Sequence, residues 1–135
     1  MGGTMGGVLQ IFFNSGEAAL AARAGAGTGV GAGRGWTEAF VAGVEGVKLY
    51  GGAEVGMRTV LDAVIPAAMV LQKEGAAGFG AAVAAAEAGA ESTRGMEASA
   101  GRANYVGTDG LRGVPDPGAK AAAVAMRAVA GALGC

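Results

Sequence analysis

Segments with apolar residues at helical spacing, separated by glycine-rich breaks, are the feature of this sequence that limits its fold most. The segments are 4–24, 36–50, 59–74, 78–100 and a last one that starts at Asp116. None of them shows the alternation of apolar and polar residues that is typical of a half-buried strand. A chain of 135 residues also suits a single domain. We therefore expect an all-α fold of about five antiparallel helices, with one domain over residues 1–135.

Glycine accounts for 28 of the 135 residues, roughly three times its usual share of ~7%. In segment 25–35 it stands at every second position, which favours a flexible loop over regular structure. Small residues also let helix backbones approach closely, so we expect tight helix packing. The expected inward faces are Val8, Phe12, Ser15 and Ala19; Phe40, Val44 and Val47; Val60, Val64, Ala67 and Leu71; Ala81, Ala84, Ala85 and Ala88; and Ala121, Val124, Ala128 and Leu133 or Val129.

Pro66 lies inside segment 59–74 and removes one helical hydrogen bond, which leaves the carbonyl of Asp62 without its donor. The Asp62 side chain is interpreted as a solvated or capping carboxylate, and a role in a site is the alternative. Further along, Glu91 and Arg94 are three residues apart and can pair on a helix surface.

Two helix starts could bind an anion. Asp116 followed by Pro117 predicts the start of the last helix, because the carboxylate can accept from free N–H groups and proline fits the first helical position. Helix starts are favourable places for phosphate. The glycine-rich run 2–7 also offers free N–H groups. An ordinary helix start is the simpler interpretation there, because no Walker pattern follows.

Several classes of function are excluded or disfavoured by composition. The chain has no histidine, so it has no Ser-His or Cys-His nucleophile system and no histidine metal ligand. Its net charge of −1 gives no electrostatic footprint for nucleic acid. No apolar run reaches the ~18 residues of a membrane span, and the N-terminus lacks the signal-peptide pattern. The single cysteine, Cys135, fits a reducing compartment, so we expect a cytoplasmic protein.

Four short motifs follow one another along the chain. They are Gly2-Gly3-Thr4-Met5-Gly6-Gly7, then Gly56-Met57-Arg58-Thr59-Val60-Leu61-Asp62-Ala63, then Gly101-Arg102-Ala103-Asn104-Tyr105-Val106-Gly107, and finally Asp116-Pro117-Gly118-Ala119. In the same order they resemble G-G-[ST]-S-G, G-D-[KR]-T-M-L-D-A, G-R-A-S-Y-hydrophobic-G and D-P-G-A of the L domain of dihydroxyacetone kinases. The resemblance spans nearly the whole chain.

The resemblance implies the later part of an eight-helix antiparallel barrel that binds ATP or ADP at one mouth. Carried over by position, it implies Gly3, Thr4 and Met5 at the phosphates, Gly51, Thr59 and Val60 at the base and ribose, Arg102 near the phosphates, and Asp116, Pro117 and Gly118 closing the pocket. Alternate connections of an up-and-down bundle lie at the same end. We therefore expect these segments to meet at one end.

The sequence departs from the family pattern at several points. Met5 stands where the family has a second hydroxyl, and Met57 where it has an aspartate. The aspartate cluster G-D-x-D-x-G, which binds two magnesium ions in the family, has no counterpart in this chain. Mg²⁺ is therefore expected only in the complete family domain, and we assign no metal ligand and no catalytic residue here. The acceptor-carrying K domain, in the same chain or a separate one, is the implied partner.

Two functions are compatible with these observations. The first is the ATP-binding part of a dihydroxyacetone kinase that phosphorylates a small ketose, inactive alone. We prefer a piece of a longer kinase to a short natural protein that has lost catalysis. The alternative function is a non-catalytic helical interaction or regulatory module with a degenerate nucleotide site. About three barrel helices would be lacking, which predicts an apolar groove and self-association as a homo-oligomer.

Overall fold

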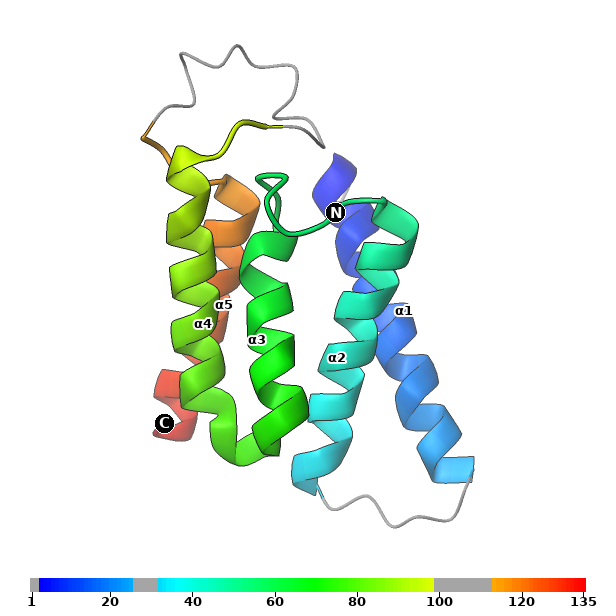
Figure 1. The fold of residues 1–135 in the computed structure, drawn as a ribbon. Coiled ribbons are helices and arrows are strands. Elements are labelled where there is room, and N and C mark those ends of the chain that lie inside the picture. Colours follow the sequence, from blue (N-terminus) through cyan, green and yellow to red (C-terminus); the bar gives the residue numbers. More distant parts are fainter. Residues whose placement is uncertain (1–2, 26–31, 99–112) are drawn as a thin grey trace.

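The computed structural model of the chain describes residues 3–25, 32–98 and 113–135. Five α-helices form this part: α1 (Gly3–Gly25), α2 (Ala32–Gly51), α3 (Leu61–Glu74), α4 (Phe79–Ser92) and α5 (Pro117–Leu133), with short 3₁₀ turns η1 (Gly75–Gly78) and η2 (Thr93–Gly95) (Figure 1). The described residues contain no strand. The expected all-α fold of about five antiparallel helices is confirmed.

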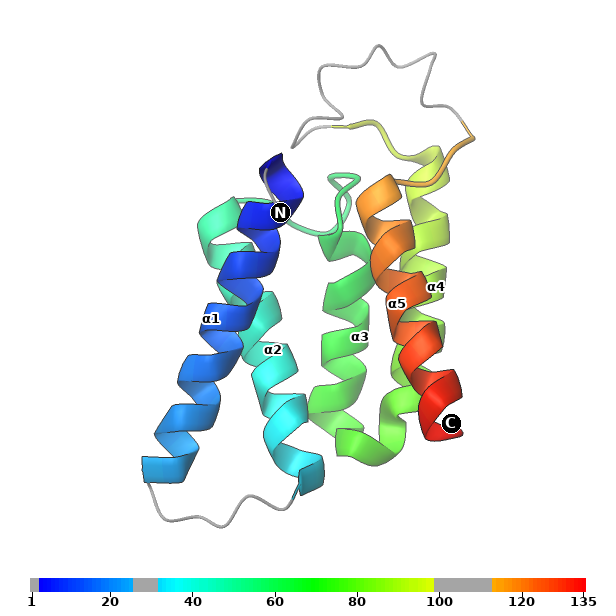
Figure 2. The same ribbon diagram turned by 180° about the vertical axis from the view of Figure 1, so that it is seen from behind.

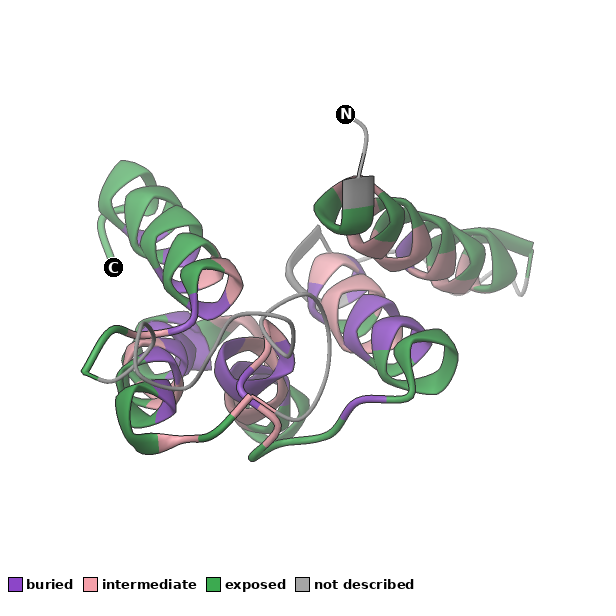
Figure 3. Cartoon of the chain, turned by 90° about the horizontal axis from the view of Figure 1, so that it is seen from above, coloured by how far each residue is buried: buried purple, intermediate pink, exposed green. Residues whose placement is uncertain are grey.

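The helices run up and down, so the starts of α1, α3 and α5 and the ends of α2 and α4 lie at one end (Figure 2). Helix α1 packs on α2, α2 also packs on α3, and α3 packs on both α4 and α5. Seen along the helix axes, α1 and α2 form one pair and α3, α4 and α5 form a second group (Figure 3). Among the described helices, none has the length and hydropathy needed to cross a membrane.

The main core lies between α3, α4 and α5. It contains twelve buried residues, eight of them alanine: Ala63, Ala67, Leu71, Phe79, Ala82, Val83, Ala86, Ala90, Ala119, Ala123, Met126 and Ala130. Such small side chains let the helix backbones come close together. The closest approach is at Gly89 of α4, where an added Cβ would lie 2.0 Å from the Asp62 carbonyl oxygen. Because Pro66 leaves that carbonyl without its helical donor, α4 covers the point where α3 is interrupted.

Helices α1 and α2 also meet through glycine, but far fewer of their side chains are buried between them than in the core of α3, α4 and α5. A Cβ at Gly43 would lie 2.6 Å from the ring of Phe12, and one at Gly46 would lie 2.1 Å from the Ser15 hydroxyl. Of the α1 residues whose burial is described, only Gly16 is buried. Phe12 is partly buried and packs edge-on against Phe40 of α2, with ring centroids 5.5 Å apart. Helix α1 is therefore held mainly by one neighbour.

The sequence-based helix limits differ from the structure at three places. Helix α2 begins at Ala32 rather than at residue 36, so the end of the glycine-rich segment 25–35 is helical and not part of a loop. Helix α4 ends at Ser92 and does not continue towards residue 100. The hydroxyls of Ser92 and Thr93 donate to the carbonyls of Gly89 and Ala90, which offers the backbone an alternative to a further helical turn. Helix α3 begins at Leu61 rather than at residue 59, because the preceding residues form a turn.

The expected inward faces of the last two helices are wrong as well. In α4, residues 81, 84 and 88 are exposed and residue 85 is half-buried, while the buried face comprises Phe79, Ala82, Val83, Ala86 and Ala90. In α5, Ala121, Val124, Ala128, Val129 and Leu133 are exposed, and Ala119, Ala123, Met126 and Ala130 are buried. Both helices carry alanine on every face, so periodicity alone could not identify the buried face. The faces expected for 36–50 and 59–74 are buried or half-buried, as predicted.

Candidate functional site

A cavity of about 340 Å³ lies where α1, α3 and α5 begin and α2 ends. Eight of the ten residues expected at a nucleotide site line it: Thr4, Met5, Gly51, Thr59, Val60, Asp116, Pro117 and Gly118. Gly3 is the first residue of α1 and is not among the lining residues. Arg102 lies outside the described residues. The structure thus brings four separate segments together, and their role in nucleotide binding stays a prediction.

The turn before α3 is fixed by Asp62. Its carboxylate is almost completely buried and accepts two backbone hydrogen bonds, from the N–H of Gly56 at 2.5 Å and from that of Thr59 at 2.7 Å. Gly56 and Arg58 both have left-handed backbone conformations, with φ of 96° and 58°. Asp62 is therefore a buried carboxylate that fixes the turn; it is not solvated, and α3 has no side-chain cap hydrogen bond.

Arg58 is a wall residue that the sequence interpretation missed. Its side chain lines the cavity and is only 1% exposed. The guanidinium Nη2 donates to the carbonyl oxygen of Val114 at 2.8 Å, across 56 residues of sequence. Two signals could have identified it: it is the basic position of the second motif, and it stands between the glycine and the threonine of a turn.

The start of α5 forms the opposite wall, and its expected cap is confirmed. Asp116 Oδ2 accepts from the N–H of Ala119 at 2.8 Å, and Pro117 occupies the first turn. The N–H of Asp116 donates to the Thr93 hydroxyl at 2.7 Å, and that hydroxyl donates to the Ala90 carbonyl at 2.6 Å. Thr93 thus ties the start of α5 to the end of α4.

A second connection joins the same two elements nearer the surface. Arg94 forms the expected ion pair with Glu91. Its guanidinium also donates to the Gly113 carbonyl oxygen, and the Gly113 N–H donates to the Arg94 carbonyl oxygen at 3.4 Å. The segment that leads into α5 is therefore attached to η2 as well as to the turn before α3.

Polar and apolar residues both line the cavity. Thr4, Arg58, Thr59 and Asp116 are polar, while Val8, Val47, Ala53, Val60 and Leu61 provide apolar surface. A buried guanidinium favours an anion, and so does the start of a helix. Apolar lining residues favour a ring. The arrangement can hold a ligand that combines an anionic group with a ring system, and its volume lies within the range typical of small-molecule sites.

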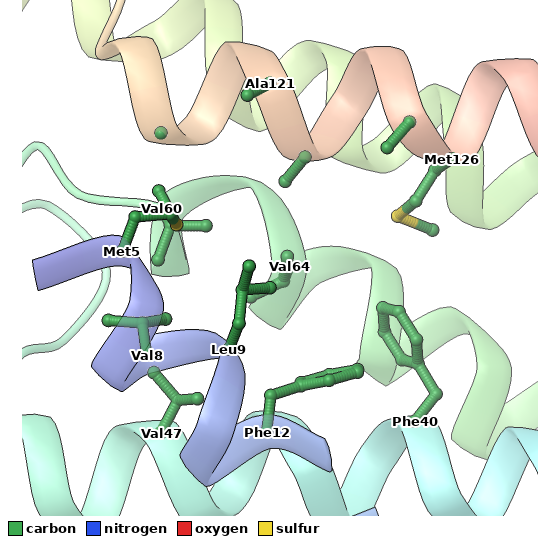
Figure 4. Close-up of a pocket in the computed structure, with 13 residues that line it drawn as sticks. Met5, Val8, Leu9, Phe12, Phe40, Val47, Val60, Val64, Ala121 and Met126 are labelled. Atoms are coloured by element: carbon green, nitrogen blue, oxygen red, sulfur yellow. The ribbon is translucent and has the colours of Figure 1, made fainter. Parts of the chain in front are cut away.

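Met5 stands at the boundary of this cavity. A Cβ added to Gly118 would lie 3.2 Å from the Met5 methyl carbon, so the methionine spans from α1 to the first turn of α5. Figure 4 shows Met5 and Val60 side by side beneath α5. A thioether at this place supplies contact but no hydrogen-bond donor.

A second, apolar cavity of about 360 Å³ continues from the first between α1, α2, α3 and α5. Met5, Val8 and Val60 line both, and Leu9, Phe12, Phe40, Val64 and Met126 line the deeper part (Figure 4). The expected apolar groove corresponds to this space. Self-association through it stays a prediction, which sedimentation velocity would test.

The described residues do not fit a magnesium site. They contain no group of three acidic, cysteine or histidine side chains that could hold a metal ion. Asp62 and Asp116 both lie near the cavity, but their carboxylates accept hydrogen bonds from backbone N–H groups. We therefore derive no metal-dependent step from this chain.

Known proteins resemble nearly the whole chain. The sequence profile of the DAK2 domain matches residues 1–131. A relative from Solanum lycopersicum, named as a candidate 3,4-dihydroxy-2-butanone kinase, is 45% identical over 136 residues. Triokinase/FMN cyclase from Homo sapiens is 39% identical over 135 residues, and dihydroxyacetone kinase from Citrobacter freundii is 38% identical over 131. Each alignment covers 96% of this chain but only 22% of the relative's length.

Proposed function

The chain belongs to the DAK2 domain family, and from this premise we propose that it is the ATP-binding part of a dihydroxyacetone kinase. The observation that carries the proposal is the single cavity in which eight of the ten family-implied residues meet. They come from α1, α2, the turn before α3 and the start of α5. Three of these segments carry family motifs, and the fourth is the end of α2 at Gly51.

The chemistry of the cavity supports a nucleotide as its ligand. Apolar lining residues such as Val47, Val60 and Leu61 suit the adenine ring, and the polar lining residues suit the phosphates. Among the polar residues, Arg58 places a guanidinium at the cavity, and the α5 start adds the favourable end of a helix dipole. Phosphate at a helix N-terminus is a common arrangement in nucleotide sites.

The complete reaction needs more than this chain. We propose transfer of the terminal phosphoryl group of ATP to a hydroxyl of a small ketose such as dihydroxyacetone, in the cytoplasm. Phosphoryl transfer relies on positioning and on neutralising phosphate charge, commonly through Mg²⁺. The described residues provide positioning, while the metal ligands and the ketose-carrying K domain would come from other segments or another chain. The chain alone is accordingly inactive as a kinase.

One observation favours a second candidate, a non-catalytic helical interaction or regulatory module with a degenerate nucleotide site. Met5 occupies the boundary of the cavity without offering a donor to phosphate. Met57 stands at the family's aspartate position, where its sulfur accepts weakly from the Glu54 N–H at 3.4 Å. Met5 lines the cavity and Met57 does not, so the first difference from the family pattern removes a polar group from the cavity itself. Measurable nucleotide affinity separates the two candidates.

The test is isothermal titration with ADP, with and without Mg²⁺. Gly51 borders the cavity, and a Cβ there would meet no atom within 4 Å, so Gly51→Leu adds bulk at the mouth without a backbone clash. We expect saturable ADP binding that is weakened at least about tenfold in this variant. Gly7→Leu, equally unhindered but not among the lining residues, is the control. A folded wild-type protein without ADP binding would overturn the proposal.

A further inference from the structure

We infer that Arg58 is a positioning residue that fixes the distance between the two walls of the cavity, from the α3 side to the α5 side. This inference rests on the proposed function for its consequence in nucleotide binding. The structural part of the inference is that Arg58 holds the turn before α3 to the segment that leads into α5. This part can be tested without any ligand.

The backbone around Arg58 is held in an unusual conformation. Arg58 has a φ of 58°, which side chains other than glycine rarely adopt. The conformation is imposed from both sides, because the buried Asp62 carboxylate accepts from the N–H groups of Gly56 and Thr59. Strained residues of this kind persist where the surroundings fix them, and they cluster at functional sites. Here the conformation places the guanidinium inside the protein, where it is 1% exposed.

The buried guanidinium reaches the other wall. Nη2 donates to the Val114 carbonyl oxygen at 2.8 Å, and Val114 lies two residues before the helix cap Asp116. A hydrogen bond from a charged donor in a buried place is stronger than one at the surface. The bond therefore links the turn that carries Thr59 and Val60 directly to the segment that leads into Pro117 and Gly118.

The opposite side of the α5 start has its own attachment. Thr93 accepts from the N–H of Asp116, and Arg94 donates to the Gly113 carbonyl. These contacts fix the α5 start to α4 but not to the turn before α3. Among the hydrogen bonds described above, only the one from Arg58 joins the turn before α3 to the segment that leads into α5. Removing it should loosen the segment from 113 to 119 towards the mouth and leave the rest of the fold in place.

The experiment compares three variants by amide hydrogen exchange without ligand and by titration with ADP. Arg58→Met keeps an unbranched apolar stem and the backbone strain of the residue, but it is shorter and has no donor. Arg58→Lys keeps the charge and one donor group, without the planar fork. Arg94→Met is the matched control, because it removes an exposed arginine that contacts the same segment.

In Arg58→Met we expect the Asp116 amide to exchange at least about tenfold faster, and ADP to bind about tenfold more weakly. Arg58→Lys should fall between it and the wild type, and Arg94→Met should change both quantities less than about twofold. A purely structural role predicts faster exchange throughout α1 to α5 instead. If Arg58→Met does not fold, Arg58→Lys carries the same test, with an expected acceleration of about threefold.

The outcomes separate this inference from the proposed function. Wild-type protein that binds no ADP would overturn the proposed function. The exchange rates would still test whether Arg58 holds the two walls of the cavity together. An unchanged exchange rate of the Asp116 amide in Arg58→Met would overturn the claim that Arg58 holds this segment in place. Faster exchange at Asp116 with unchanged ADP affinity would overturn the positioning role.

Discussion

The α3–α4–α5 group and the α1–α2 pair are both built from small residues, but they use them differently. In the first, twelve buried residues form one cluster, and alanines bring three helices together. The cluster beside the second has only three buried residues. Val47 belongs to α2, Ala53 follows α2 and Leu61 begins α3, while α1 contributes partly buried side chains alone. The glycines of α2 permit close contact with α1, yet this contact removes little apolar surface from water. The two groups should therefore differ in stability.

This difference matters because the candidate site lies between the two groups. Its α3 and α5 walls belong to the group with the larger core, whereas Thr4 and Met5 come from α1. Regions with few buried contacts open at lower free energy than the core. We expect α1 to be the movable wall of the site. Each of the following substitutions affects one side of this comparison.

The largest expected effect is in the well-packed group. In Gly89→Ala the new Cβ would lie 2.0 Å from the Asp62 carbonyl oxygen, which is backbone and cannot rotate away. We expect the free energy of unfolding to fall by about 3 kcal/mol. Urea denaturation followed by far-ultraviolet circular dichroism measures it.

Gly80→Ala in the same helix is the control. A Cβ there would meet no atom within 4 Å. The free energy of unfolding should therefore rise by about 0.5 kcal/mol, because alanine reduces the conformational entropy of the unfolded chain. Equal stability of the two variants would show that α3 and α4 are not in the close contact described here.

A smaller and more local effect is expected between α1 and α2. In Gly46→Ala the Cβ would lie 2.1 Å from the Ser15 hydroxyl and 2.8 Å from its Cβ. The hydroxyl can rotate but the helices must still separate, at a cost of about 1–2 kcal/mol. Hydrogen exchange should accelerate in α1 and stay unchanged in α4. Gly7→Ala, which meets no atom within 4 Å, is the control, and equal acceleration in α4 would contradict a separate α1–α2 pair.

The helix cap at the site contributes less. Asp116→Ala removes the acceptor for the Ala119 N–H and should lower the free energy of unfolding by about 1 kcal/mol. Asp116→Asn keeps an acceptor oxygen and should lose only part of this. Thermal unfolding of the two variants checks the order, and an Asn variant less stable than the Ala variant would contradict the capping role.

The smallest effect is expected at the surface between α4 and α5. Arg127 forms a hydrogen-bonded ion pair with Glu87, and this bond lowers the Glu87 pKa below its ordinary value of 4.5. Because the ionised Glu87 is favoured in the folded state, its interaction with Arg127 stabilises the fold at neutral pH. This stabilisation is lost as the pH falls through the pKa of Glu87 in the folded state. Glu87→Gln should therefore slightly reduce the urea midpoint at pH 7, with a difference that shrinks below pH 4.5. A difference that grows in acid would have the wrong sign.

The sequence predicted the helices well where apolar and polar residues differ clearly. The Asp116 cap, the glycine-rich contacts and the meeting of motif segments at one end all follow from local chemistry and up-and-down topology. The buried faces of α4 and α5 did not follow, because alanine lies on every side of both helices. The end of α4 at Ser92 was missed because it depends on hydroxyl hydrogen bonds.

The site was predictable in part, and mostly through family resemblance. The motif position of Arg58 could have singled it out, but its burial could not be predicted from the sequence, because it depends on a left-handed turn and on Val114, a partner 56 residues away. The position of Met5 against Gly118 likewise depends on how α1 packs beside α5. Contacts between distant segments of this kind are not encoded in local spacing.

The central claim is that a nucleotide binds between the α1–α2 pair and the α3–α4–α5 group. Amide hydrogen exchange of the wild-type chain with and without ADP tests this most directly. The account predicts protection on both sides, in the first turns of α1 around Thr4 and in residues 114–119 at the start of α5. Binding that protects only one of these sides, or neither, would contradict a site between the two groups.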